Sequence, residues 1–208
     1  MSRSKRTATS ASSAPDKPPL SVRPLTPDDW PTIARLFGPQ GACAGCWCMF
    51  WRVRGRAWST GRGATHRAAF RELVRCGRVH GVLAFAGDEP VGWCNVGPRE
   101  DFPRLEASRV LATGAPPSTW GVLCFFVPPR WRRRGVAAAL LARAVELARE
   151  RGAVRIEGYP VRPGPNGRIA AAFAWTGVPR LFERARFREA PGVSPARPIF
   201  RRVFRRAR

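Results

Sequence analysis

Residues 121–152 read GVLCFFVPPRWRRRGVAAALLARAVELARERG, and this stretch decides the fold. Its first part, 121–127, is an apolar run rich in Val and Phe, which is typical of a strand buried on both faces. Pro128 and Pro129 end that strand because proline cannot continue a sheet ladder. From Val136 onward apolar residues recur at helical spacing. The stretch therefore predicts a buried strand, a basic turn and a helix.

The turn between the predicted strand and helix contains Arg132, Arg133, Arg134 and Gly135. The first N–H groups of a helix have no partner within the helix, and the helix dipole favours negative charge there. A glycine at this point lets the backbone approach a ligand closely. The turn therefore predicts an anion-binding site. The alternative is a solvated arginine turn that only joins the strand to the helix.

The spacing of this turn resembles the acetyl-CoA signature of the GNAT acyltransferases, which reads Gln or Arg, two residues, Gly, one residue, then Gly or Ala. Arg132, Gly135 and Ala137 match the signature, and Val127-Pro128-Pro129 matches the Val-x-Pro strand end that precedes it. The expected order of elements matches the family over about residues 20–205. The resemblance implies an α/β (α+β) GNAT fold, with a mixed, mostly antiparallel central sheet flanked by helices.

Periodicity and turn residues predict the other elements. The expected strands are 20–24, 79–86, 90–96, 121–127, 154–161 and 198–204. The expected helices are 26–37, 65–76, 101–111, 170–185 and the one that starts at 136. Thr26 and Asp29 form a predicted capping box for the first helix. Residues 1–19 are rich in Ser, Pro and basic side chains, which predicts a disordered tail (with a transit peptide as the alternative), and 20–208 is predicted to be a single GNAT domain.

The resemblance assigns acetyl-CoA as the co-substrate and names the residues that bind it. Backbone groups of Phe126 and Val127 are implied to contact the pantetheine arm. The Val127 N–H is implied to polarise the thioester carbonyl and to stabilise the oxyanion formed by attack. The pyrophosphate is implied to lie on the turn and the first helical residues, namely Arg132, Arg133, Arg134, Gly135, Val136 and Ala137.

The catalytic residues are less clear from the sequence, because it departs from the family where the acid is usually found. Phe182 stands where many members have Tyr, and Arg186 stands where they usually have Gly. Tyr159 is the one tyrosine of the chain, and Glu157 shares its face of the predicted strand. We expect Glu157 as general base and Tyr159 as general acid. The alternative is that Glu157 pairs with an arginine and Tyr159 is a packed aromatic at the rim.

Three cysteines fall within six residues, at Cys43, Cys46 and Cys48. Zinc usually takes four ligands, and no paired spacing points to a fourth, so no metal site is expected. Small thiols that are buried or line the cleft are the favoured interpretation, with a redox role as the alternative. Cys124 is expected to pack in the core rather than to act as a nucleophile. The run Cys-Trp-Cys-Met-Phe-Trp-Arg resembles one bacterial GNAT subgroup. Its members expected to shape the acceptor pocket are Trp47, Phe50, Trp51 and Arg52.

The net charge is +23, and all basic residues except Lys5 and Lys17 are arginines. A positive surface attracts anions such as CoA, and it attracts nucleic acid as well. No apolar run reaches the roughly 18 residues that span a membrane. We therefore expect a cytoplasmic N-acetyltransferase that acts on a small-molecule or protein amine, with a homodimer possible. The alternatives are a basic protein associated with nucleic acid or ribosomes, and a GNAT-like protein that binds CoA without catalysis.

Overall fold

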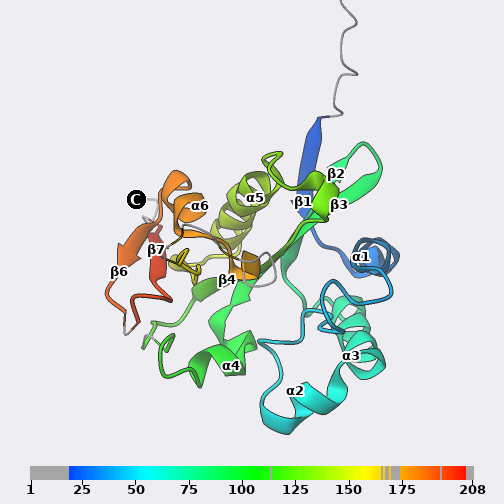
Figure 1. The fold of residues 1–208 in the computed structure, drawn as a ribbon, viewed down its shortest axis with the longest axis horizontal. Coiled ribbons are helices and arrows are strands. Elements are labelled where there is room, and N and C mark those ends of the chain that lie inside the picture. Colours follow the sequence, from blue (N-terminus) through cyan, green and yellow to red (C-terminus); the bar gives the residue numbers. More distant parts are fainter. Residues whose placement is uncertain are drawn as a thin grey trace, which may run out of the picture.

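The computed structural model describes residues 19–112, 114–164, 166, 169, 174–192 and 194–204. Their strands form one seven-stranded sheet in the order β1-β2-β3-β4-β5-β7-β6 (Figure 1). The strands are β1 (Leu20–Pro24), β2 (Gly81–Ala86), β3 (Glu89–Pro98), β4 (Thr119–Phe126), β5 (Arg155–Gly158), β6 (Arg188–Ala190) and β7 (Ile199–Val203). The α-helices are α1 (Trp30–Phe37), α2 (Gly55–Gly61), α3 (Ala64–Arg75), α4 (Pro103–Glu106), α5 (Val136–Glu150) and α6 (Pro179–Arg184). Single turns of 3-10 helix lie at η1 (Pro27–Asp29), η2 (Arg99–Asp101), η3 (Pro129–Trp131) and η4 (Ala174–Thr176).

The expected mixed sheet is confirmed. Strands β4 and β5 pair in parallel, and α5 connects them. All other neighbouring strands in the sheet pair antiparallel. A parallel pair needs a crossover connection, usually a helix, and the strand–turn–helix stretch of the sequence provides it. The signature stretch therefore lies in the middle of the sheet.

Several elements differ from the expectations at their ends. The helix expected at 101–111 is reduced to the four residues of α4, and the strand expected at 154–161 ends at Gly158. The helix expected at 170–185 is divided into η4 and α6 by Gly177, whose φ of +86° no ordinary helix adopts. Its first residues, 170–173, lie outside the described residues, as does the predicted tail apart from Pro19.

Helix α2 and strand β6 were not expected from the sequence. Helix α2 begins and ends with glycine, a poor helix former, and β6 has three residues. Segments this short have no periodicity that a sequence pattern can show. They form because the neighbouring chain supplies partners, such as β7 for β6.

The sheet is covered on both faces. Helix α5 packs on one face through Val136, Leu140 and Leu141, in a cluster with β2, β3 and β4 that also includes Phe182 of α6. On the other face, α1 and α3 bury a second cluster that includes Phe37, Phe70 and Trp93. A third cluster lies on this second face near β4 and β5, and its members are Trp51, Phe102, Leu105, Leu111, Leu123, Tyr159 and Ile199.

The predicted capping box at the start of the first helix is confirmed. The Thr26 N–H donates to Asp29 Oδ2 at 2.8 Å. The Arg23 guanidinium of β1 also clamps this carboxylate, with two hydrogen bonds of 2.6 Å. This ion pair lowers the pKa of Asp29 against the opposing effect of burial, and the cap from Thr26 lowers it further. One side chain thus ties the first strand to the first helix.

We expect Asp29→Asn to lower the free energy of unfolding by about 1–2 kcal/mol at neutral pH, since it weakens a cap and an ion pair whose arginine is half-exposed. A carboxyl group whose pKa is lowered on folding stabilises the folded state at pH values above its unfolded pKa of about 4. This stabilisation is lost as the pH falls through the lowered pKa. The difference between wild type and variant should therefore shrink below about pH 4. Urea unfolding at several pH values measures it, with the exposed neighbour Asp28→Asn as control. A difference that does not change with pH would contradict the ion pair.

Candidate active site

Strands β4 and β5 separate in the middle of the sheet. Their parallel pairing runs from Thr119–Arg155 to Val122–Gly158 and stops there, although β4 continues to Phe126. Beyond β5 the chain turns to other partners, and the Val161 N–H donates to the Gly177 carbonyl at 3.1 Å. The last four residues of β4 thus present an edge that β5 does not pair.

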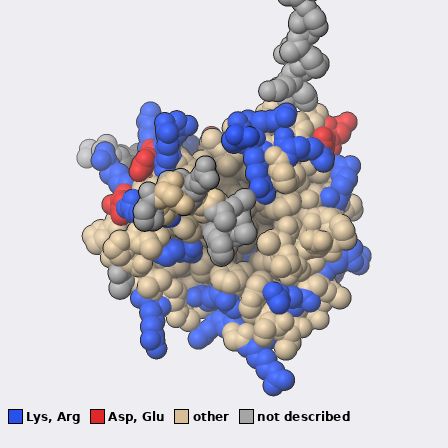
Figure 2. Space-filling model, in the orientation of Figure 1, with Lys and Arg blue, Asp and Glu red and all other residues tan. Residues whose placement is uncertain are grey.

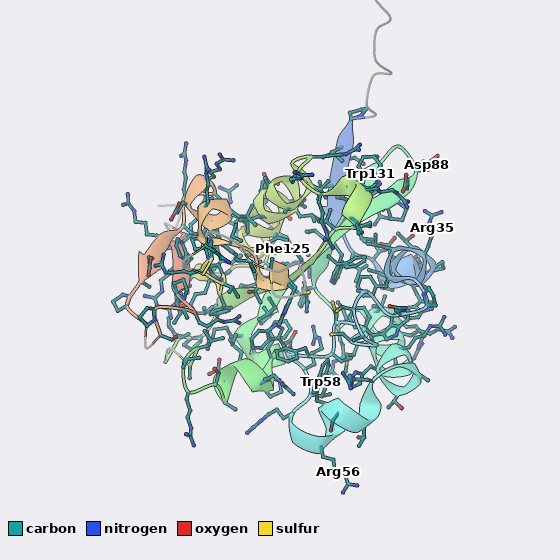
Figure 3. All side chains as sticks on the ribbon, in the orientation of Figure 1. Arg35, Arg56, Trp58, Asp88, Phe125 and Trp131 are labelled. Atoms are coloured by element: carbon teal, nitrogen blue, oxygen red, sulfur yellow. The ribbon has the colours of Figure 1, made fainter. Side chains whose placement is uncertain are left out.

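Strand β4 also bulges at the point where this edge begins. Asn95 of β3 pairs with Cys124 and the next residue, Val96, pairs with Val122, so Leu123 is the additional residue. The Leu123 carbonyl accepts a 3.0 Å hydrogen bond from the Trp51 indole, so it points away from β3. Backbone groups alternate along a strand, which directs the N–H groups of Phe125 and Val127 to the same side as that carbonyl. Phe125 lies close to the centre of the molecule (Figure 3).

The turn after β4 leads directly into the N-terminus of α5. Gly135 caps this helix with φ +82°, and because it has no side chain it cannot satisfy the first N–H groups. A Cβ added at Gly135 would meet nothing within 4 Å, so the space beside it is open. Arg133 also has a positive φ, of +58°. The turn therefore presents helix N–H groups and a positive dipole end to solvent, as an anion site requires.

Side chains fix the shape of the turn. Arg132 Nε donates to the Val127 carbonyl at 3.0 Å, which closes the turn onto the end of β4. The Trp131 indole donates to Glu89 at 3.2 Å, beside the β2–β3 turn that carries Asp88 (Figure 3). Three arginines of the turn are exposed, namely Arg132, Arg133 and Arg134. The structure thus brings the predicted CoA-binding residues, from Phe126 to Ala137, together as one edge and one turn.

The two predicted catalytic residues lie together on the opposite face of β5 from α5. Glu157 is fully buried, and three guanidinium groups contact its carboxylate: Arg99 at 2.8 Å, Arg201 at 3.0 Å and Arg155 at 3.1 Å. Tyr159 is also fully buried. Its hydroxyl donates to Glu157 at 3.1 Å and accepts from Arg99 at 2.6 Å. Glu157 is therefore paired with arginine in this structure, as the alternative interpretation expects.

Burial raises the pKa of Tyr159 well above its usual value, and the Glu157 carboxylate raises it further against the opposing effect of Arg99. A phenol with a raised pKa gives up its proton less readily. Arg99 is 3 % exposed and lies in η2, directly after β3. No sequence signal connects Arg99 to Glu157, because the two residues are far apart in the chain and meet through strand pairing.

The position at which the resemblance would place a tyrosine is occupied by a core ring. Phe182 is fully buried and packs edge-on against Phe125, with ring centroids 6.3 Å apart. It also fills the space over Gly158, where a Cβ would collide with the ring. The side chain at this position therefore carries no proton donor.

The residues expected to shape the acceptor pocket separate into two groups. Trp47 is buried against Trp30 and Phe37 of the α1 layer. Phe50 and Trp51 instead stack edge-on with each other, 4.9 Å between centroids, beside the opening of β4. The membership of the Cys46–Arg52 run in one bacterial subgroup stays a prediction.

Two further tryptophans join Phe50, and the sequence did not single them out. The ring centroid of Trp175 in η4 lies 5.1 Å from that of Phe50, and the ring centroid of Trp58 in α2 lies 5.2 Å from it. The Arg104 guanidinium lies over the Phe50 ring at 4.3 Å. The segments that carry these rings are distant in sequence, so only the folded chain brings them together.

Two thiols of this region, those of Cys46 and Cys124, have raised pKa values. Burial raises the pKa of Cys46 to about 12, and the nearby Cys48 adds to the effect. A hydrogen bond with Cys48 and burial raise the pKa of Cys124 well above its usual value. Cys124 packs against the α1–α3 cluster, as expected for a core thiol. Among the described residues, no group of three or more His, Cys, Asp or Glu side chains is placed to hold a metal ion.

Basic side chains are spread over many elements of the visible face, with few acidic ones between them (Figure 2). On this face the distribution gives a general positive field rather than one basic groove. Within the described part of the chain, no helix has the length and apolar character needed to cross a membrane.

Several solved structures with similar folds are acetyltransferases. PaiA N-acetyltransferase from Thermoplasma acidophilum, in complex with coenzyme A, is 11% identical, with a TM-score of 0.51 over 89% of this chain and 99% of that chain. YncA from Salmonella typhimurium, solved with its cofactor acetyl-CoA, is 15% identical, with a TM-score of 0.51 over 90% of this chain and 95% of that chain. An N-acetyltransferase from Staphylococcus aureus Mu50 is 13% identical, with a TM-score of 0.52 over 89% of this chain and 98% of that chain. At these identities the similarity shows the fold.

A comparison with curated protein sequences gave no significant match. The family model described as Acetyltransferase (GNAT) family matches residues 46–168. This match covers more than half of the chain and includes the unpaired edge of β4, the basic turn and α5. The chain belongs to the GNAT acetyltransferase family.

Proposed function

We propose that this protein is an acetyl-CoA-dependent N-acetyltransferase. One observation carries the proposal: the unpaired edge of β4 leads through a glycine-bearing turn into the open N-terminus of α5. The edge offers N–H donors to an acyl carbonyl, and the turn offers a site for phosphate groups. The bound CoA of PaiA and the bound acetyl-CoA of YncA, on the same fold, support this assignment.

In this proposal each part of the site has one task. The turn from Arg132 to Ala137 binds the pyrophosphate through backbone N–H groups, and its arginine side chains add charge-assisted hydrogen bonds. The backbone of Phe126 and Val127 binds the pantetheine arm. The Val127 N–H donates to the thioester oxygen. A preorganised donor of this kind contributes about 3–4 kcal/mol to transition-state stabilisation. The alternation along β4 makes the Phe125 N–H a second donor on the same edge.

The reaction in this proposal is direct attack by an amine on the thioester carbonyl. The C–N bond forms, the C–S bond breaks, and the amine loses a proton while the CoA thiolate gains one. The roles of Glu157 as base and Tyr159 as acid stay a prediction. Their burial, the three arginines around Glu157 and the raised pKa of Tyr159 favour a positioning role instead. Water can then serve in part for the missing acid, because acid–base help is typically worth ~10²–10⁴-fold.

The test is acetyl transfer to a panel of primary amines. We expect release of the CoA thiol, together with a product heavier by one acetyl group, for at least one amine. The product is identified by mass spectrometry, and thiol release without amine serves as the control for hydrolysis. Tight binding of acetyl-CoA with no acetylated product from any amine would instead support a CoA-binding protein without catalysis.

A further inference from the structure

Arg52 carries a buried positive charge with one unused edge. Its side chain is 8 % exposed, and its contact to a carboxylate is a long one, 3.8 Å from Nη1 to Asp101 Oδ2. Within the described part of the chain, Nε and Nη2 have no hydrogen-bond partner, and both atoms are buried. Leaving charged donors buried without partners is costly, so such an edge needs an explanation.

The unused edge has the shape that binds a carboxylate. Nε–H and Nη2–H point the same way from the planar guanidinium, so they form a two-pronged donor. Elsewhere in this protein the same edge holds a carboxylate: Arg75 Nε and Nη2 donate to the two oxygens of Glu72, at 2.9 and 2.7 Å. In Arg52 the equivalent pair of donors has no partner among the described residues.

A second buried polar side chain faces the same layer. Asn95 of β3 is fully buried, and neither its amide nitrogen nor its oxygen has a partner among the described residues. Gly97 follows on the same face of β3, and a Cβ there would lie 3.4 Å from Phe102. The Arg52 guanidinium lies 4.8 Å from the centre of the Phe102 ring. Asn95 therefore lies on the face of β3 on which Phe102 packs, and Arg52 packs on the same ring, in the layer that covers this face.

This layer adjoins the opening of β4. Asn95 pairs with Cys124, the residue next to the bulge. Arg52 follows Trp51, whose indole bonds to the bulge residue Leu123. The two unpartnered groups therefore lie beside the strand whose N–H groups are proposed to hold the thioester.

We infer that Arg52 binds a carboxylate of the acceptor, so that the preferred acceptors are primary amines that carry a carboxylate. The inference rests on the proposed function, since it names the acceptor class of that same site. Asn95 supplies a neutral donor and acceptor for the same ligand. A single planar pair of donors matches the two oxygens of a carboxylate. Arg104 does not offer the same pair of free donors, because its Nε donates to the Val53 carbonyl and its guanidinium lies over the Phe50 ring.

The experiment compares carboxylate-bearing amines with their neutral counterparts. Glycine, β-alanine, 4-aminobutyrate and 6-aminohexanoate are each paired with the corresponding carboxamide. We expect kcat/KM for the best acid to exceed that of its carboxamide by about 10- to 100-fold, as for a charge-assisted hydrogen bond. In Arg52→Lys and Arg52→Gln the preference for the acid should fall to about twofold or less, because the charge-assisted hydrogen bond is lost. The ratio of the two kcat/KM values, acid over carboxamide, is the readout in each variant.

The controls separate a specific contact from a general field or a folding defect. Arg75→Gln removes one positive charge elsewhere on the surface and should keep the full preference. Arg52→Lys keeps the charge but loses the paired donors, and its melting temperature reports on folding. Equal use of acids and carboxamides by wild type, or a preference that survives in both Arg52 variants, overturns the inference. Loss of the preference in Arg75→Gln as well overturns it too.

A binding measurement distinguishes failure of this inference from failure of the proposed function. Calorimetry with CoA present measures the affinity for the N-acetylated acids, which are the reaction products. Binding that needs Arg52 but is accompanied by no acetyl transfer supports the carboxylate site and contradicts the proposed catalysis. Acetyl transfer to amines without Arg52-dependent carboxylate binding supports the proposed function and overturns the inference.

Discussion

Gly135→Glu is expected to abolish stabilisation by acetyl-CoA. At acetyl-CoA about 100 times above its dissociation constant, wild type should gain ~2.7 kcal/mol, or roughly 5–10 °C in melting temperature for a domain of this size. A glutamate at the N-terminus of α5 places a bulky negative group in the open space beside Gly135, where the pyrophosphate is proposed to lie. Both charge repulsion and occupied volume then oppose binding.

The matched control for this variant is Gly152→Glu. Gly152 follows the other end of α5, has φ +78°, and a Cβ there also meets nothing within 4 Å. Both substitutions therefore impose the same backbone strain and the same change in charge. Thermal unfolding with and without acetyl-CoA compares them. If Gly135→Glu keeps the shift, or if Gly152→Glu loses it equally, the anion site at this turn is wrong.

Glu157→Gln is expected to lower the free energy of unfolding by about 3–5 kcal/mol, because it removes the negative partner of buried arginines. Arg99 and Arg155 then keep positive charges in the interior with one counter-ion fewer. This loss is a large part of the ~5–15 kcal/mol that stabilises a typical domain. Urea unfolding measures it. The matched control is Glu106→Gln, which also pairs with Arg99 but is half-exposed, and which should cost no more than about 1 kcal/mol.

The same variant decides between the two roles of Glu157. If Glu157 is the general base, kcat should fall by about 10²–10⁴-fold and the pH–rate profile should lose one of its limbs. If it is a positioning residue, folded Glu157→Gln protein should keep the shape of that profile. Tyr159→Phe extends the test to the acid, because it removes the proton donor but keeps the ring. Unchanged stability in Glu157→Gln would contradict the buried ion-pair network.

The sequence predicted most elements of the fold because their signals are local. The buried strand before Pro128, the helix from Val136 and the capping box of Thr26 and Asp29 each arise from neighbouring residues. Ends of elements were less predictable, as the early end of β5 at Gly158 shows. That end depends on where β4 and β5 separate, and this is a property of the sheet rather than of the segment.

The candidate site also has parts that local sequence signals predict and parts that depend on long-range contacts. The turn from Arg132 to Ala137 could be named from the sequence because its donors are backbone groups at fixed spacing. The partners of Glu157 could not, because Arg99 and Arg201 reach it from other strands. From the sequence, Phe182 is interpreted as a departure from the family pattern, and only its packing on Phe125 shows that its side chain belongs to the core.

By itself, then, the sequence determined most of the order of the elements, the basic glycine-bearing turn before α5 and the family resemblance, because short-range periodicity, proline, glycine and helix ends act within a few residues. Only the tertiary structure decided the burial of Glu157 and Tyr159, the unused edge of Arg52 and the aromatic group around Phe50. These features depend on strand register and on loops that meet across the sheet. Burial and pairing of charges are set by such long-range contacts, which no local pattern in the chain contains.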